Sequence, residues 1–241
     1  MMRGIAYGVG VGPGDPELMT LKAVRLIRES EVIALPGAEP GETLAYRIAV
    51  AAVPELAHRE LVPVCMPMVK DRARIDPEHR RAAKRIEGYL DQGRDVVFLT
   101  LGDPTVYSTF TYIRRCLEAD GYETAMVPGV TSFCAAAARL NVPLCAWDEP
   151  LHILPVAQAP DGTLDAPGTC VLMKSGGHLA EVKRRLRDSG RDAMMVENCT
   201  LPGERICRGV DGMPDDAGYF TLIIAREGRG FADHTEGDAM R

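Results

Sequence analysis

Residues 96–104 of this 241-residue chain read VVFLTLGDP, and this stretch indicates the fold. The run from Val96 to Leu99 is apolar at every position, as in a parallel strand that helices cover on both faces. Gly102 then allows a sharp bend and a close approach to the main chain. Since ligands of open α/β sheets bind outside the carboxyl ends of strands, we expect a functional turn at 100–104.

Asp103 in this turn has two interpretations from sequence alone. Its carboxylate could accept hydrogen bonds from a ribose or attract a cationic ligand. It could equally cap a helix that has Pro104 at its first position. The sequence leaves both open.

Strand-like and helix-like segments alternate on both sides of this stretch, which predicts an α/β architecture. Strands are expected near 4–11, 32–35, 61–64, 122–127, 152–156, 170–173, 193–196 and 219–225. Helices are expected near 21–27, 43–52, 76–91, 105–119 and 179–189. The length allows two compact α/β domains or one large one, and we expect a frayed acidic tail over 228–241.

Two further turns follow predicted strands. GVGPGDP (10–16) matches neither GxGxxG nor GxxxxGK[ST], so the dinucleotide and P-loop interpretations lose their main support. VPGVTS (127–132) offers the hydroxyls of Thr131 and Ser132 near a helix start, where free N–H groups favour polar ligands. Ordinary turn formation and helix capping explain the same residues equally well.

Composition narrows the classes of function. The net charge of -6 disfavours a nucleic-acid partner, and no apolar run approaches the roughly 18 residues that a membrane span needs. The seven cysteines form no CxxC pair and the five histidines show no HxxxH or HExxH spacing, so no metal site is expected. Reduced thiols and the lack of a signal-peptide pattern predict a cytoplasmic protein.

In order and spacing, the three turns resemble the tetrapyrrole methylase family. The matching segments are GVGPGDPELMT, GDPTVYS, VPGVTS and ENCTLPGERI (197–206), and the resemblance runs from about residue 4 to 225. GDPTVYSTF and VPGVTSFCAAAARLNVPL look most like the branch that methylates precorrin-2 or cobalt-factor II at the C(20) meso carbon.

The resemblance implies two α/β domains, over 1–120 and 121–227, with a ligand cleft between them. It also implies S-adenosylmethionine as methyl donor, a tetrapyrrole substrate and a homodimer. The cofactor contacts that it implies are Pro13, Leu101, Gly102, Asp103, Val106, Tyr107, Thr131, Ser132, Met173, Cys199 and Ala225. Pro13 and Asp15 would border the tetrapyrrole. Cys199 stands where relatives often carry glycine or alanine.

Methyl transfer from a sulfonium is an in-line displacement, so positioning matters more than a nucleophilic side chain. Asp15 is the candidate base, with turn capping as its alternative role, and Tyr107 could orient the substrate or pack on the cofactor. Arginines that could bind the substrate's carboxylates bidentately are Arg72, Arg74 and Arg114.

Three alternative functions stay open. They are methylation of uroporphyrinogen III at C(2) and C(7), a same-fold methylase acting on rRNA or protein, and a tetrapyrrole-binding module without catalysis. The acidic charge disfavours the rRNA version.

Overall fold

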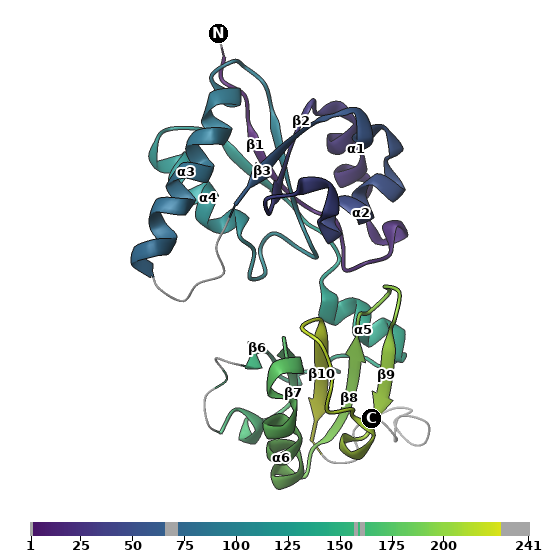
Figure 1. Cartoon of the computed structure of the whole chain (residues 1–241). Helices are drawn as coiled ribbons and strands as arrows, with labels where there is room; N and C mark the ends of the chain where they lie inside the picture. Colours follow the sequence, from purple (N-terminus) through teal and green to yellow (C-terminus); the bar gives the residue numbers. More distant parts are fainter. Residues whose placement is uncertain (1, 66–71, 157–158, 160–161, 228–241) are drawn as a thin grey trace. The chain divides into compact units, whose positions relative to one another are not determined.

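The computed structural model describes residues 2–65, 72–156, 159 and 162–227. The chain forms two compact units, Met1–Thr131 and Ser132–Arg241, and each is built on a sheet of its own (Figure 1). The sequence places the boundary after residue 120, which differs from this division. The cause is the strand at 124–127, which pairs with the first strand of the chain and so belongs to the first unit. The predicted tail over 228–241 lies outside the described residues.

The first unit contains a five-stranded parallel sheet in the order β3-β2-β4-β1-β5. Its strands are β1 (Ala6–Gly10), β2 (Val32–Pro36), β3 (Glu60–Val64), β4 (Val96–Thr100) and β5 (Thr124–Val127). Its helices are α1 (Leu21–Glu29), α2 (Leu44–Ala52), α3 (Arg72–Leu90) and α4 (Phe110–Ala119). Short 3-10 turns lie at Pro16–Leu18, Pro40–Glu42 and Pro54–His58.

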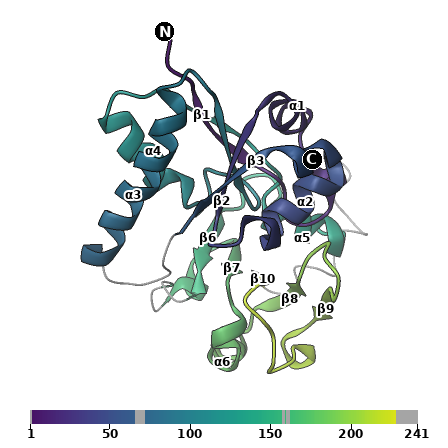
Figure 2. The same ribbon diagram turned by 45° about the horizontal axis from the view of Figure 1, so that its top comes forward.

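Helices cover both faces of this sheet. Figures 1 and 2 show α1 and α2 on one face and α3 and α4 on the other. Because strand side chains alternate between the two faces, Leu99 joins the apolar cluster beneath α1 and α2, and Phe98 joins the cluster beneath α3 and α4. All five residues of β4 are buried, so the doubly covered strand predicted from residues 96–99 is confirmed.

The starts of α1 and α3 compare differently with the prediction from sequence. The Thr20 hydroxyl accepts a hydrogen bond from the Ala23 N–H at 3.2 Å and caps α1, as the sequence predicts. In contrast, α3 begins at Arg72 rather than at the predicted start near residue 76, and Pro77 lies inside it. Since proline lacks only its own N–H, Pro77 removes one hydrogen bond near the start of the helix without ending it.

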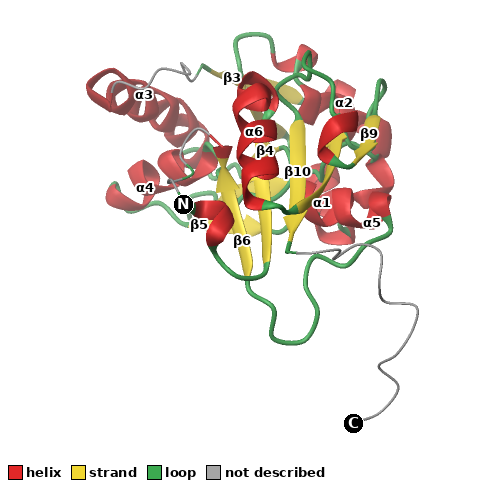
Figure 3. Cartoon of the chain, turned by 90° about the horizontal axis from the view of Figure 1, so that it is seen from below, coloured by secondary structure: helices red, strands yellow, loops and turns green. Residues whose placement is uncertain are grey.

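The second unit contains a mixed sheet in the order β6-β7-β10-β8-β9. Its strands are β6 (Leu151–Pro155), β7 (Thr169–Met173), β8 (Asp192–Glu197), β9 (Arg205–Arg208) and β10 (Thr221–Arg226). Its helices are α5 (Ser132–Leu140) and α6 (Leu179–Ser189), and 3-10 turns lie at Thr163–Asp165, Gly176–His178 and Val210–Gly212. Figure 3 shows α6 lying over one face of the sheet, where its apolar side closes the core of this unit.

Among the described strands of this sheet, β6 and β7 are the one pair of neighbours that pair in parallel, because β10 lies between β7 and β8 in the opposite direction and β9 pairs antiparallel with β8. The strand β9 was not expected from the sequence. Its four residues, RICR, have arginine at both ends and give too short a pattern to recognise.

Candidate functional site

The three predicted turns follow three neighbouring strands of the first unit. Since β1 lies between β4 and β5 and all run parallel, the turns at 11–16, 101–109 and 128–131 leave the same edge of the sheet. We call these three turns the glycine edge. The chain leaves β1 toward α1 on one face and leaves β4 toward α4 on the other. In open α/β sheets, ligands bind at the carboxyl ends of strands whose connections diverge in this way.

Glycines let the three turns touch through their main chains. Gly102 donates to the Gly12 carbonyl at 2.7 Å, and the Gly12 N–H donates back to the Gly102 carbonyl at 3.3 Å. A Cβ on Gly129 would stand 2.1 Å from the Gly102 oxygen, and one on Gly10 would stand 2.5 Å from it. No side chain fits at either position, so these two glycines are required by the packing of the turns.

Gly102 differs from its neighbours in what surrounds it. Its φ of +70° is left-handed, and a Cβ built there would meet no atom closer than the Val130 oxygen at 3.9 Å. Glycine is favoured here for its backbone conformation rather than for lack of room. The space beside Gly102 is therefore where another molecule could approach this main chain.

The buried side chain of Asp103 links the second turn (101–109) to the third (128–131) by hydrogen bonds. It is 7% exposed. Its Oδ1 accepts hydrogen bonds from the N–H and hydroxyl of Thr105 at 2.7 and 2.5 Å, and its Oδ2 accepts one from the Gly129 N–H at 2.9 Å. Both carboxylate oxygens are thus used in hydrogen bonds within the protein. Of the two interpretations from sequence, the local cap describes this geometry, although the capped segment is a turn and not α4.

The helix α4 begins at Phe110, five residues later than expected. Tyr107 interrupts the predicted helix, because its φ of +49° is left-handed and incompatible with a helical turn. The Ser108 hydroxyl then accepts the Phe110 N–H at 3.1 Å and lies 3.2 Å from the Thr100 hydroxyl. The result is a bulge in which the Tyr107 side chain is 52% exposed at the glycine edge.

The other predicted residues of the first unit lie at the same edge. Pro13 is buried, and Leu101 and Val106 are half-buried, Leu101 against the core beneath α1 and α2. Asp15 is half-buried, and its Oδ1 accepts the Glu17 N–H at 2.9 Å. Asp15 therefore does cap the 3-10 turn that follows it.

Thr131 and Ser132 stand at the junction of the two units. Thr131 is the last residue of the first unit and Ser132 is the first residue of α5. Both are half-buried. The run of small residues after them is buried at Ala135, Ala136 and Ala137, so α5 can pack closely against β10.

The second unit also presents strained turns at one edge of its sheet. Left-handed φ values at non-glycine residues occur at Lys174, directly after β7, and at Asn198 and Thr200, directly after β8. Such residues cost free energy and cluster at ligand sites. Of the predicted residues, Met173 is the last residue of β7, and Cys199 lies in the turn after β8. We call the residues 173–178, 198–204 and 216–220 the aromatic edge, after the exposed rings of Tyr219 and Phe220.

Cys199 is not suited to nucleophilic chemistry. Its side chain is buried, and burial raises the pKa of its thiol to about 11. Since the thiolate is the reactive form, this cysteine stays protonated and unreactive near neutral pH. All seven cysteines are free thiols.

Ala225, also predicted as a cofactor contact, lies away from this edge of the sheet. Since β10 runs antiparallel to β7 and β8, Ala225 pairs with Cys170 and Ala193 at the start of those strands. It lies about 10 Å along the strand from the residue that faces Met173, and it is fully buried.

The residues of β10 that reach the aromatic edge are at its beginning. Thr221 pairs with Glu197, the last residue of β8, and the Phe220 carbonyl accepts the Asn198 N–H at 3.0 Å. Sequence reasoning missed both Phe220 and Thr221, because the pattern of an isolated strand does not reveal the direction in which it joins a sheet.

The predicted substrate arginines receive little support. Arg114 lies on α4 and donates from Nε to Glu118 at 2.7 Å in an exposed pair. Arg72 and Arg74 lie in the first turn of α3, and their side chains are outside the described residues.

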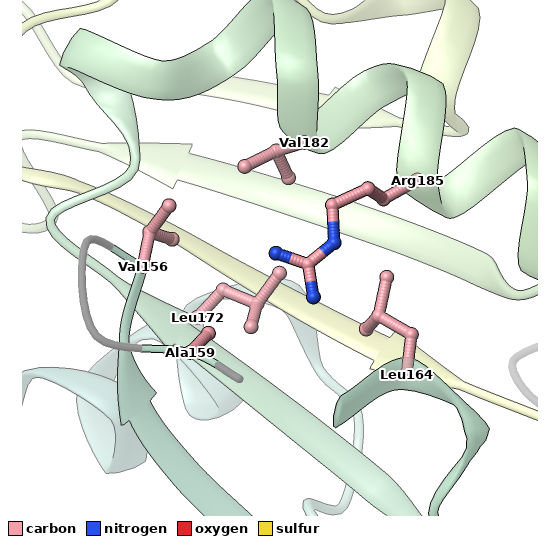
Figure 4. A pocket seen from close by; sticks show the side chains of 6 residues that line it. All are labelled: Val156, Ala159, Leu164, Leu172, Val182 and Arg185. Atoms are coloured by element: carbon pink, nitrogen blue, oxygen red, sulfur yellow. The ribbon is translucent and has the colours of Figure 1, made fainter. Parts of the chain in front are cut away.

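A separate hollow lies between α6 and the sheet of the second unit. Figure 4 shows the guanidinium of Arg185 pointing into it among apolar side chains. The residues that line it are Val156, Ala159, Leu164, Leu172, Val182 and Arg185. None of the predicted site residues is among them.

In the described part of the chain, no three His, Cys, Asp or Glu side chains are grouped so as to hold a metal ion. None of its helices combines the length and the apolar character that crossing a membrane requires.

Comparisons with known proteins show the family of this chain. Residues 6–211 match the family model of the tetrapyrrole (corrin/porphyrin) methylases. The cobalt-precorrin-2 C(20)-methyltransferase of Salmonella typhimurium is 31% identical over 236 residues, which cover 94% of this chain and 98% of that protein. The cobalamin biosynthesis protein CobIJ of Mycobacterium tuberculosis is 35% identical over 240 residues, and there the chain spans only 47% of the relative's length.

A solved structure has the same fold. The uroporphyrin-III C-methyltransferase of Thermus thermophilus, in complex with S-adenosylhomocysteine, superposes with a TM-score of 0.67 at 26% identity. The match covers 93% of this chain and 98% of that one.

Proposed function

This chain belongs to the tetrapyrrole methylases, and we propose from that premise that it methylates precorrin-2 or cobalt-factor II at C(20) with S-adenosylmethionine. The observation that carries the proposal is the match over nearly the full length of a C(20)-methyltransferase. The match to CobIJ, which is named for cobalamin biosynthesis, supports the same pathway, although this chain spans about half of that relative.

The glycine edge fits the proposed donor. Gly102 leaves space beside a strand end, and Asp103 places a negative charge there that favours a cationic ligand. When bound, S-adenosylmethionine supplies a methyl group on a positively charged sulfur. We propose that this edge binds the donor through Pro13, Leu101, Gly102, Val106, Tyr107 and Thr131, with Asp103 acting by its charge and by holding the turns.

In the second unit we propose donor contacts at Ser132, Met173 and Cys199, and we add Phe220 and Thr221 in place of Ala225. Asp103, Thr105 and Gly129 form a rigid frame, so the first unit would offer the donor a preformed surface. Positioning is the main requirement, since holding reacting atoms about 3–3.5 Å apart can supply roughly 7–11 kcal/mol of the barrier.

Proton removal is the remaining chemical task. After attack by the electron-rich meso carbon, that carbon must lose a proton to restore conjugation. We propose that Asp15 accepts it, since the carboxylate is half-buried beside Pro13 and one of its oxygens already fixes its orientation by capping the next turn.

One alternative has an observation in its favour. The Thermus thermophilus structure is named as a uroporphyrin-III C-methyltransferase, so the same fold also accommodates that class of substrate. Uroporphyrinogen III methylation at C(2) and C(7) is therefore the second candidate.

A direct assay separates the two. Purified protein is incubated with S-adenosylmethionine in three parallel reactions that contain precorrin-2, cobalt-factor II or uroporphyrinogen III. The mass of each product is then measured by mass spectrometry. One added methyl on either of the first two supports the C(20) proposal. Two methyls on uroporphyrinogen III and none on the others would refute it.

We also propose that the protein acts as a cytoplasmic homodimer with a small-molecule substrate and neither nucleic-acid nor membrane partners. Family membership and the net charge of -6 support this view. Light scattering on the purified protein measures the oligomeric state, and a monomer at working concentration would contradict the dimer.

A further inference from the structure

Glu197 is a buried carboxylate whose partners come from two segments that are distant in sequence. Its Oε2 accepts the Arg205 Nε–H at 2.5 Å, and its Oε1 accepts the Gly218 N–H at 2.5 Å. Only 6% of the Glu197 side chain is exposed. Arg205 also donates a hydrogen bond from Nη1 to the Asp216 Oδ1 at 2.9 Å. Glu197 thus ties β9 and the turn before β10 to the end of β8.

Two other contacts hold the same turn. The Thr221 hydroxyl donates to the Gly218 carbonyl at 2.7 Å. From the side of β7, Gly176 packs so closely that a Cβ there would stand 1.9 Å from the Gly218 oxygen. The position of Gly218 is therefore fixed from β7, β8 and β10 at once.

This fixed turn determines what the aromatic edge presents. Tyr219 and Phe220 follow Gly218 directly, are 50% and 45% exposed, and pack edge to face with ring centroids 5.3 Å apart. The Phe220 carbonyl holds the left-handed Asn198 through its N–H, and Cys199 comes next. A shift of Gly218 would therefore move both rings and the bend that carries Cys199.

We propose that Glu197 is a positioning residue for the methyl donor, acting through the Gly218 turn on the Phe220 and Cys199 surface. The inference rests on the proposed function, which assigns that surface to donor binding. Glu197 itself contacts no donor atom in this proposal, since both of its oxygens are used within the protein.

The charge on Glu197 is essential to this role. Arg205 holds the pKa of the Glu197 carboxyl below its ordinary value, so the carboxylate is ionised at neutral pH. A glutamine would keep the shape but would have to turn its NH₂ group toward either the Arg205 or the Gly218 N–H. Two hydrogen-bond donors would then face each other, and the hydrogen bond on that side of residue 197 would be lost.

The test measures S-adenosylhomocysteine binding by calorimetry in Glu197→Gln and in a matched control. The control is Glu149→Gln, which removes the negative charge from the 2.5 Å pair with buried Arg226 near the opposite end of the same sheet. Both variants should lose thermal stability. Only Glu197→Gln should weaken the affinity, by about tenfold or more, because the Phe220 and Cys199 surface would no longer be held in place.

The outcomes separate the two proposals. If the unaltered protein fails to bind S-adenosylhomocysteine, the proposed function fails first. If it binds, and Glu197→Gln keeps its affinity within twofold while losing stability like the control, the positioning role is wrong and the function stands. Should Glu197→Gln not fold, Arg205→Gln removes the cation that orients the Glu197 carboxylate without changing a proposed donor contact, and unchanged affinity in that variant contradicts the inference equally.

Discussion

Replacing Asp103 by asparagine tests how the glycine edge is built. The carboxylate accepts three hydrogen bonds, from two groups of Thr105 and from the Gly129 N–H. An asparagine has one acceptor oxygen, so it can serve Thr105 or Gly129 but must turn its NH₂ group toward the other. We therefore expect Asp103→Asn to separate the second turn from the third.

The expected cost follows from the bonds lost. One hydrogen bond to a charged group contributes about 1.5–3 kcal/mol, and the remaining two become weaker without the charge. For a unit of this size a loss of that magnitude lowers the melting temperature by about 5–10 °C. Affinity for S-adenosylhomocysteine should fall as well, because the loosened turns would carry the donor contacts.

Differential scanning calorimetry with and without S-adenosylhomocysteine measures both effects. Asp15→Asn is the matched control for stability, since it makes the same change in a neighbouring turn where asparagine caps as well as aspartate does. An Asp103→Asn protein with unchanged melting temperature and abolished affinity would refute the reasoning. It would mean that the carboxylate contacts the donor directly and does not hold the turns.

Three further predictions concern single residues. Asp15→Asn should keep the melting temperature within about 1 °C but lower kcat by about a hundredfold or more if Asp15 is the base, and unchanged kcat would remove it from that role. Gly129→Ala should destabilise the protein by about 1–3 kcal/mol, since its Cβ would overlap the Gly102 oxygen at 2.1 Å, and a urea midpoint equal to the parent's would contradict this packing. Because the pKa of Cys199 is about 11, iodoacetamide at pH 8 should leave Cys199 unmodified while it labels the exposed Cys145. Peptide mass mapping that finds Cys199 labelled first would show that its thiol is not buried.

The sequence alone was sufficient for the elements that depend on neighbours along the chain. The all-apolar run of β4, the cap at Thr20 and the strand-helix alternation are local properties, and the structure confirms them. The family was also recognisable from sequence, because glycine turns of fixed spacing record where main chains must approach closely.

Pairing between distant segments was decided only by the tertiary structure. The sequence could not show that Asp103 would reach the Gly129 N–H, because 26 residues separate them and the contact depends on β1 lying between β4 and β5. The same reason accounts for Ala225: a strand pattern has period two in either direction, so only the antiparallel pairing of β10 shows that its first residues, and not its later ones, reach the aromatic edge. Residue pattern determines what a segment is, whereas its direction and partners depend on contacts made after the chain has folded.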